Sequence, residues 1–378
     1  MDDDVYRNAA YARAFAAVPK RLTKWLEIGC GAAATLTKLA LHNGPAGVQI
    51  TAFEANAQSA ASAKEQLRTA LSCAPKDKRK LSRVNVVAGK STQPELLGAA
   101  DRTFDLLYHE LFGVFASSEG CALMLTHARQ TYAAAHARGA LGRSAGPPHL
   151  LMIPARCATF VTPLSLRPAA CDRAETIYCN SAVNPKLILV PSAPIAEHAL
   201  AVHSRAFEYY DFSSTLQTKQ EKELTFTVSE DGVLNSLAVF IWVDLGTGKS
   251  ASDAAGGNGG NGGGGRFCCR FPFGDEGLGG SALTTQTNYF TSLCSDETRQ
   301  DETYANNWMN PLLLLPHSTA VRRGDRLRLR TVAAVDSLRP SYTFDLTHFP
   351  RDGIAGAAGV PLGTLEISFD DLYPDSGI

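Results

Sequence analysis

The sequence predicts an α/β protein in which a Rossmann-like domain is followed by an antiparallel β-barrel or sandwich domain. From Lys24 to about Pro154, apolar runs of strand length alternate with helical stretches, which is the pattern of a parallel, doubly wound sheet. Beyond Pro154, short β-rich pieces recur between turn residues, as they do in antiparallel sandwiches and barrels. We therefore expect one domain at residues 1–154 and a second at residues 155–378.

The elements of the first domain alternate in a regular order. Its expected strands are WLEI, VQITAFE, RVNVVAG, FDLLYHE and HLLMI, and the helical stretches between them are ATLTKLALH, AASAKEQLRTAL and CALMLTHARQTYAAAHA. The expected strands of the second domain are ARCATFVTPL, KELTFTVSE, LAVFIWVDL, ALTTQTNYF, PLLLLP, DRLRLRTVAAV, YTFDLTHF and GTLEISF.

Composition excludes several classes of protein. The chain has 378 residues, of which 45% are hydrophobic and 19% charged, so it is long and apolar enough for two packed units. Its 36 basic and 37 acidic residues leave a formal charge of -1, so we expect no broad positive field for nucleic acid or a membrane surface. The acidic N-terminus is unlike a signal peptide, and no apolar run reaches the ~20 residues of a membrane span. We expect a cytoplasmic protein that could also enter the nucleus.

Nine cysteines are scattered along the chain without any CxxC pair or histidine at metal-ligand spacing. Their odd number favours reduced, mostly buried thiols over a disulfide or zinc framework. We therefore expect no metal.

One low-complexity stretch interrupts the second domain at about residues 247–265. It is GTGKSASDAAGGNGGNGGGG, which ends at Gly265 and contains too little apolar surface to order itself. We interpret it as a flexible, disordered loop between two strands. A loop that binds phosphate is the alternative, but no helix follows the glycines.

A glycine turn follows the first strand and indicates a nucleotide site. The strand WLEI runs into Gly29-Cys30-Gly31 and then into a helix near Ala33, so backbone N–H groups face a ligand that approaches closely. Glu54 ends the next strand, 23 residues beyond Gly31 (54 minus 31), where a Rossmann-like site places the acid that binds ribose hydroxyls. Ala33 stands where a dinucleotide site would more usually have a third glycine.

Two glutamates follow the fourth strand in FDLLYHELFGVFASSEG. Glu110 ends the strand and Glu119 closes the loop nine residues later, so both can face the carboxyl edge of the sheet, where ligands bind. Neighbouring carboxylates stay charged only with a cation between them, and the flat guanidinium of arginine suits a pair of them. The alternatives are that Glu119 stabilises the N-terminus of the following helix and that Glu110 forms a surface salt bridge.

These segments resemble those of the protein arginine methyltransferases. FDLLYHELFGVFASSEG resembles the double-glutamate loop of that family, and LEIGCG resembles its cofactor-binding motif. DDDVYRNAAYARAF resembles the helix that folds over the cofactor, VVAGKST the adenine-side segment, HLLMIPARCATF the junction into the barrel and ANNWMNPLLLLP the threonine-histidine-tryptophan loop. The motifs occur in the family's order along nearly the whole chain.

The resemblance implies an enzyme that transfers a methyl group from S-adenosyl-L-methionine to a guanidinium nitrogen of protein arginine, leaving S-adenosyl-L-homocysteine. It implies Glu110 and Glu119 as the catalytic pair and Asn307 and Trp308 as substrate-binding residues. The cofactor contacts that it implies are Arg7, Glu27, Gly29, Cys30, Gly31, Glu54, Ala55, Lys90, Ser91, Thr92 and Glu110. For Arg7 the implied partner is the methionyl carboxylate, and the alternative is that Arg7 is a solvated helix residue. For Trp308 the alternative to substrate binding is a place in the core of the barrel.

The short loop and the YRN helix are most similar to the type III group, protein arginine methyltransferase 7, in its compact single-module kinetoplastid form. This implies monomethylarginine as the product. The chain departs from the pattern at Asn307, where the type III group tends to keep glutamine, and at His109, where serine or threonine is usual. The resemblance also implies a homodimer built with a helical arm at about 164–210, and substrates among glycine- and arginine-rich RNA-binding proteins and histone tails.

Two other functions fit the sequence less well. A catalytically inactive family member that activates an active paralogue would be expected to lose a glutamate or the glycine turn, and this chain retains both. A dinucleotide-dependent oxidoreductase is disfavoured by Ala33 and by the lack of a second Rossmann half.

Deletion of residues 251 to 264 tests the interpretation of the glycine-rich stretch. We expect the variant to keep the fold and any activity, because the glycines contribute no side chain to a core. Thermal unfolding compares it with the intact chain. A collapsed melting temperature would contradict the interpretation.

Overall fold

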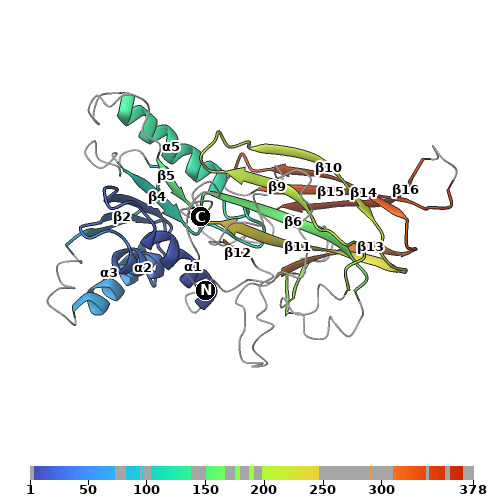
Figure 1. Ribbon diagram of the computed structural model, residues 1–378, viewed down its shortest axis with the longest axis horizontal. Helices are drawn as coiled ribbons and strands as arrows, with labels where there is room; N and C mark the ends of the chain where they lie inside the picture. Colours follow the sequence, from blue (N-terminus) through green and yellow to red (C-terminus); the bar gives the residue numbers. More distant parts are fainter. Residues whose placement is uncertain are drawn as a thin grey trace, which may run out of the picture.

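The structure is a computed structural model with a parallel sheet and its helices at one end and antiparallel sheets at the other (Figure 1). It describes residues 4–72, 82–93, 96, 104–137, 150–166, 175–178, 187–190, 198–246, 289–291, 310–337, 340–353 and 358–368. The glycine-rich stretch at 247–265 and the two residues Asn307 and Trp308 lie outside the described residues.

The parallel sheet has five strands in the order β3-β2-β1-β4-β5. The strands are β1 (Lys24–Ile28), β2 (Gln49–Glu54), β3 (Val84–Ala88), β4 (Leu106–His109) and β5 (Leu151–Ile153). Strands β2 and β3 add to one side of β1, and β4 and β5 then add to its other side. This reversal opens a crevice at the carboxyl ends of β1 and β4, the place where such sheets bind ligands.

The helices pack on the two faces of this sheet. They are α1 (Val5–Ala16), α2 (Thr35–Asn43), α3 (Ala57–Ser72) and α5 (Cys121–Ala137). Figure 1 shows α5 above the sheet and α2 and α3 below it. On α3 the buried residues are Ala60, Ala63, Leu67 and Leu71, a spacing of three and four that places them on one face. Among the described helices, none combines the length and apolarity that crossing a membrane requires.

Helix α1 is held against the end of β4. Asp4 caps its N-terminus, because the side chain accepts a hydrogen bond from the Arg7 amide at 3.0 Å. The buried Tyr11 hydroxyl donates to the backbone oxygen of His109 at 2.7 Å. One turn further on, the Phe15 ring lies 5.5 Å from Trp25 and 5.1 Å from Tyr108. These contacts place the beginning of α1 over the crevice.

Two antiparallel sheets form the second half. One has the order β10-β14-β15-β16 and the other β7-β8-β13-β11-β6-β9, with β12 paired to β11. The strands are β6 (Arg156–Leu164), β7 (Glu175–Tyr178), β8 (Leu187–Val190), β9 (Arg205–Asp211), β10 (Lys219–Thr227), β11 (Gly232–Asp244), β12 (Tyr289–Thr291), β13 (Asn310–Val321), β14 (Arg326–Ala334), β15 (Ser341–Phe349) and β16 (Val360–Ser368). The RLRLR run of β14 illustrates the pattern: Leu327 and Leu329 are buried, and the arginines between them are exposed.

The described part of the predicted arm is extended. Where a helical arm was expected between 164 and 210, the described residues form β7, β8 and β9. The apolar LILV run of β8 pairs antiparallel with β13, so it is a strand of the barrel sheet. Residues 167–174, 179–186 and 191–197 of this range lie outside the described residues.

The two halves share one continuous core of buried side chains, which includes residues from the parallel sheet and from β6, β9 and β15. The parallel part ends at Ile153 and the antiparallel part begins at Arg156. Three cysteines within the described residues, Cys30, Cys121 and Cys157, are buried free thiols. The loop after β4 lies between the two halves, and it carries Glu110 and Glu119.

Replacing Tyr11 by Phe tests how α1 is held. The variant loses one buried hydrogen bond to His109 and should lower the free energy of unfolding by about 1 kcal/mol. Urea unfolding measures this. Arg13→Lys on the exposed face of the same helix is the control and should leave stability unchanged. If the two variants unfold alike, the contact contributes nothing to holding α1.

Candidate functional site

A cavity of about 300 Å³ lies at the carboxyl ends of β1, β2 and β4. It is lined by Ile28, Gly29, Gly31, Phe53, Glu54, Ala55, Gly89, Lys90, Ser91, Thr92, Glu110, Leu111, Glu119 and Met124. Its walls therefore come from the glycine turn, the ends of β2 and β3, the loop after β4 and α5. This is the crevice that the strand order creates.

Backbone atoms of the glycine turn form one wall. Gly29 and Gly31 have φ of +76° and +63°, which L side chains rarely adopt. The Gly29 and Cys30 amides both donate to the Phe53 oxygen, at 2.9 and 3.0 Å, so the turn is tied to the end of β2. A Cβ on Gly31 would meet nothing within 4 Å, which leaves open space for a ligand against the backbone.

Two backbone amides orient the Glu54 carboxylate so that it can accept hydrogen bonds from hydroxyl groups. Its Oε2 accepts from the Gly31 amide at 2.9 Å and its Oε1 from the Asn56 amide at 3.0 Å. Each carboxylate oxygen has two acceptor positions, so each keeps one for a ligand. The side chain is thus oriented before a pair of vicinal hydroxyls arrives.

Beyond β3, the segment of Lys90, Ser91 and Thr92 forms the wall next to Glu54. Ser91 is only 5% exposed, and its Oγ has no hydrogen-bond partner among the described residues. A buried hydroxyl is costly when it is left unpaired, so this atom indicates a polar ligand on this side of the cavity.

Glu110 forms an ion pair with Arg7. Its Oε2 lies 3.0 Å from Nη1 of Arg7, whose side chain is 2% exposed. Burial raises the pKa of Glu110 to about 7, against the lowering effect of Arg7. The other oxygen, Oε1, is buried and has no hydrogen-bond partner among the described residues. Glu110 therefore has one oxygen on Arg7 and one left for a ligand.

Glu119 faces the same cavity with a higher pKa. Burial, and then the negative charge of Glu110, raise its pKa from 4.5 to about 8. Because the folded-state pKa lies above the ordinary value, the folded chain holds this proton more tightly than the unfolded chain does. The contribution of Glu119 to stability therefore falls as pH rises from about 5 to 8.

Close packing within the loop sets the place of Glu119. A Cβ on Gly113 would lie 2.2 Å from Oγ of Ser118 and 3.2 Å from Cγ of Glu119. Only glycine allows this approach, so the loop from Glu110 to Glu119 folds back on itself. Sequence spacing alone could not place the two glutamates in one cavity, but this fold does.

The pair can bind a flat, doubly donating cation. Burial raises the pKa of both carboxyls, and the charge of Glu110 adds to the rise at Glu119, so a cation between them favours the charged forms. A guanidinium presents parallel N–H donors that match carboxylate oxygens better than an ammonium does. Within the described residues, no cluster of three or more His, Cys, Asp or Glu side chains could hold a metal ion.

Three residues with expected cofactor contacts lie outside the wall of this cavity. Glu27 is buried behind the turn, where its Oε2 accepts from the Thr37 hydroxyl at 2.5 Å and from the Tyr108 hydroxyl at 2.7 Å. Burial raises the pKa of Glu27 to about 7, and its Oε1 has no partner within the described residues. Cys30 is buried, and Arg7 reaches the cavity through Glu110.

The remaining predicted residues divide into two groups. Gly29, Gly31, Glu54, Ala55, Lys90, Ser91, Thr92, Glu110 and Glu119 line the cavity. Asn307 and Trp308 lie outside the described residues, so their substrate-binding role stays a prediction. Sequence analysis missed the lining residues Ile28, Phe53, Gly89, Leu111 and Met124. Four of these adjoin predicted residues in the chain, which was the available signal, whereas Met124 comes from α5 and is placed only by packing.

Solved structures resemble this chain over nearly its whole length. Protein arginine methyltransferase 10 of Arabidopsis thaliana, in an open conformation, superposes with a TM-score of 0.62 at 13% identity, covering 97% of this chain and 95% of that chain. A chain of the Trypanosoma brucei protein arginine methyltransferase 1 enzyme–prozyme heterotetrameric complex with S-adenosylhomocysteine superposes with a TM-score of 0.59 at 13% identity, covering 96% and 95%. No protein-family model and no curated protein matches the chain. The likeness shows the fold.

The fold class predicted from the sequence is therefore confirmed: a Rossmann-like parallel sheet with antiparallel sheets after it.

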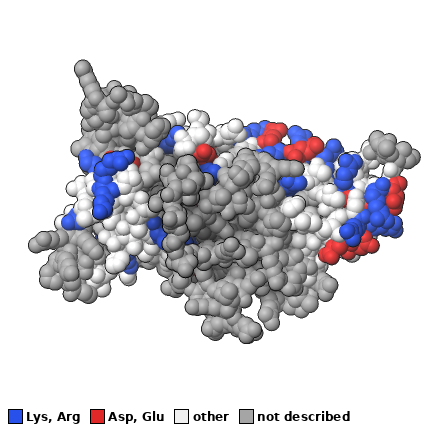
Figure 2. Space-filling view, viewed as in Figure 1, with Lys and Arg blue, Asp and Glu red and all other residues white. Residues whose placement is uncertain are grey.

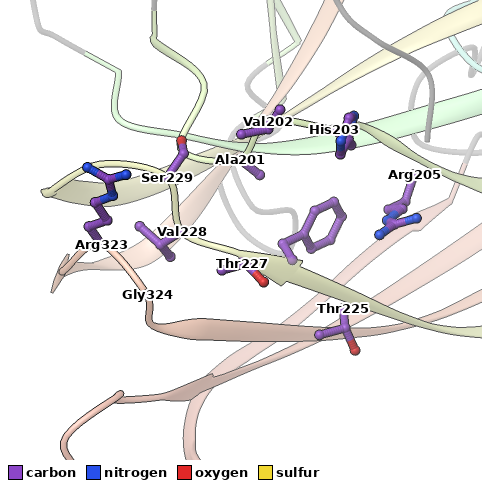
Figure 3. Close-up of a pocket in the computed structure, with 11 residues that line it drawn as sticks. Ala201, Val202, His203, Arg205, Thr225, Thr227, Val228, Ser229, Arg323 and Gly324 are labelled. Atoms are coloured by element: carbon purple, nitrogen blue, oxygen red, sulfur yellow. The ribbon is translucent and has the colours of Figure 1, made fainter.

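A second cavity, of about 600 Å³, lies in the antiparallel half (Figure 3). Its walls come from the segment before β9, the end of β10 and the turn before β14. Figure 3 shows Arg323 and Arg205 at opposite ends of it, so their guanidinium groups do not converge on one point. None of the residues predicted to be functional lines it.

Charged side chains of both signs are mixed on the face shown in Figure 2. Lys and Arg stand beside Asp and Glu over the antiparallel sheets, and no broad region of one sign is visible on the described surface of this face.

Replacing Glu110 by Gln should lower the pKa of Glu119 from about 8. The variant removes the negative charge that adds to the raised pKa of Glu119. The pKa should stay above 4.5 because burial is the larger cause. Carbon-13 NMR titration of the glutamate carboxyls measures it, with the exposed Glu223→Gln as the control. An unchanged titration midpoint would show that the two carboxylates do not interact.

Proposed function

We propose that this chain is an S-adenosylmethionine-dependent protein arginine N-methyltransferase. The observation that carries the proposal is the cavity itself, in which Glu110 and Glu119 share one space with the glycine turn and Glu54. A nucleotide-type wall and a cation-binding wall thus face each other. The fold that this chain shares with two structures of protein arginine methyltransferases supports the proposal.

The residues present fit the cofactor. Glu54 would hold the ribose hydroxyls, and the backbone at Gly31 leaves the space that a nucleoside needs. Ser91 would use its unpartnered Oγ on the adenine side. By the family resemblance Arg7 would bind the methionyl carboxylate, although in this structure its guanidinium pairs with Glu110 and does not line the cavity. When bound, S-adenosylmethionine supplies an electrophilic methyl group.

Glu110 and Glu119 would bind and orient the arginine side chain. Hydrogen bonds from the guanidinium to both carboxylates draw its positive charge toward the bound nitrogens and leave the third nitrogen a better nucleophile. Alignment in a cavity that excludes water can supply roughly 7 to 11 kcal/mol of the acceleration. Neither glutamate has to act as a strong base.

The proposed product is monomethylarginine. The proposal rests on the similarity of the loop and of the YRN helix to the type III group, and on Asn307, which keeps an amide near the place of that group's glutamine. Mass spectrometry of an arginine peptide after long incubation counts the methyl groups. A single added methyl supports type III chemistry, and two on one side chain exclude it.

We further propose a cytoplasmic homodimer that acts on glycine- and arginine-rich RNA-binding proteins and on histone tails. A closed two-fold dimer is the commonest assembly of soluble chains. Light scattering after gel filtration measures the mass in solution. Peptides from the two substrate classes, compared by kcat/KM, rank the substrates.

Glu119→Gln and Glu110→Gln should each abolish most methyl transfer. Each variant removes a charged hydrogen-bond acceptor worth about 2 to 3 kcal/mol, so kcat/KM for an arginine peptide should fall by at least ~30-fold. Affinity for S-adenosylhomocysteine, measured by calorimetry, should change only several-fold because the charges face the arginine. Glu223→Gln on the exposed face of β10 is the matched control.

A large loss of cofactor affinity in the Glu119 variant would move that residue out of its proposed role. A native chain that binds S-adenosylhomocysteine but methylates none of the peptides would exclude the catalytic function and leave an inactive, partner-activating protein as the explanation.

Methyl transfer should increase as pH rises from 6 to 9. Below about 7 Glu110 is protonated, and below about 8 Glu119 is, so at low pH the cavity lacks the charges that bind a guanidinium. Of the other charged groups near the pair, Arg7 lowers and Asp4 raises the pKa of Glu110. A profile of kcat/KM against pH tests this. A flat profile would contradict the requirement for two ionised carboxylates.

A further inference from the structure

A third buried glutamate contacts the loop that carries Glu110 and Glu119. Glu208 lies on β9, in the antiparallel half, and is 0% exposed. It does not line the cavity. We call residues 110–119 the glutamate loop, because they join the two glutamates of the site. The Glu208 carboxylate binds this loop at Ser117, two residues before Glu119.

Four donors surround the Glu208 carboxylate. Its Oε1 accepts from the Ser117 amide at 3.3 Å and from the Thr159 hydroxyl, and its Oε2 accepts from the Ser117 hydroxyl at 2.6 Å and from the Tyr210 hydroxyl at 3.2 Å. A carboxylate has about four acceptor positions, so these four donors fill them. The site is built around a group that accepts at both oxygens.

Further contacts from the antiparallel half hold residues 115–117 of the glutamate loop. The Thr159 hydroxyl accepts from the Ala116 amide at 2.8 Å while it donates to Glu208. The Tyr342 hydroxyl lies 2.6 Å from Oγ of Ser117. Next to these, the Phe115 ring packs edge-on against Tyr342 with centroids 4.6 Å apart. Strands β6, β9 and β15 of the antiparallel half therefore all hold residues 115–117.

The burial of Glu208 is costly, which indicates that it has a role other than stability. Burial raises its pKa, against the lowering effect of its hydrogen bonds. Apolar side chains of similar volume often replace a buried charged group at no loss of stability or with a gain. What apolar groups cannot do is accept hydrogen bonds from the Ser117 amide and hydroxyl and so hold them in one orientation.

The loop transmits this orientation to Glu119. The 115–118 turn is closed by hydrogen bonds from the Ser118 amide and hydroxyl to the Phe115 oxygen, at 3.1 and 2.9 Å. Ser118 also packs against Gly113, whose missing Cβ leaves room for the Glu119 side chain. A shift of Ser117 would therefore displace Glu119 from the place opposite Glu110.

We propose that Glu208 is a positioning residue through which the antiparallel half sets the place of Glu119 in the catalytic cavity. The proposal rests on the proposed arginine methyl transfer, for which a misplacement of about 1 Å at the reacting groups costs about 100-fold in rate. Glu208 touches neither substrate nor cofactor. It acts through Ser117 and the 115–118 turn.

Glu208→Gln is the principal test, because it keeps the shape and turns one acceptor oxygen into a donor facing hydroxyls. We expect kcat for an arginine peptide to fall by about 10- to 100-fold, with KM and the affinity for S-adenosylhomocysteine changed less than about threefold. Glu208→Asp keeps the charge but has a shorter side chain. Its kcat should lie between that of the native chain and that of Glu208→Gln. Glu221→Gln on the exposed face of β10 is the control.

Ser117→Ala supplies a second variant, which removes the hydroxyl contact and keeps the backbone amide. In the double variant with Glu208→Gln the loss of kcat should not exceed that of Glu208→Gln alone, because both act through one contact. Independent, additive losses would overturn the proposal. The proposal would also be overturned if these variants all lost the same amount of melting temperature but kept the kcat of the native chain.

Hydrogen exchange provides a readout that does not depend on activity. In Glu208→Gln the amides of residues 111–120 should exchange faster, whereas those of residues 24–31 should be unchanged. If the native chain methylates no peptide, the proposed function fails, yet faster exchange confined to the glutamate loop would still show that Glu208 holds it. Unchanged exchange there would show that Glu208 has no such role.

Discussion

The burial of two carboxyl groups, Glu110 and Glu119, in one cavity is the constraint on which the rest of the site depends. Arg7 neutralises one oxygen of Glu110, and the pKa of Glu119 is raised to about 8. Burial opposes the charged form of both carboxyls, so a cation that enters the cavity favours the ionised pair. The burial that disfavours the two negative charges is offset when a guanidinium binds between them.

Elements of both halves of the fold hold the two glutamates in the cavity. On one side, α1 brings Arg7 to Glu110, and the Tyr11 hydroxyl ties the helix to the end of β4. On the other side, Glu208 ties the loop to the antiparallel half. The loop is thus held at its first residue from the parallel half and near its last residue from the antiparallel half.

Local patterns were sufficient where the chemistry follows the chain. The turn at Gly29 and Gly31 and the acid at Glu54 were predicted from spacing, because a parallel strand, a tight turn and a helix place such residues together in every fold of this type. Patterns were insufficient for Glu27, which ends up behind the turn on Thr37 and Tyr108. Within the range of the expected arm, the apolar run of β8 pairs with β13 as a strand, and the arm itself stays a prediction.

By itself the sequence determined the alternation of strands and helices in the first domain, the glycine turn and the presence of two glutamates nine residues apart, because these depend on short-range geometry and on residue type. Only the tertiary structure decided that both glutamates face one cavity, that Arg7 pairs with Glu110, and that Glu208, 89 residues beyond Glu119 (208 minus 119), supports the loop. Such contacts depend on how distant segments pack, and burial sets the charge state of the groups they bring together. No local pattern of residues contains that information.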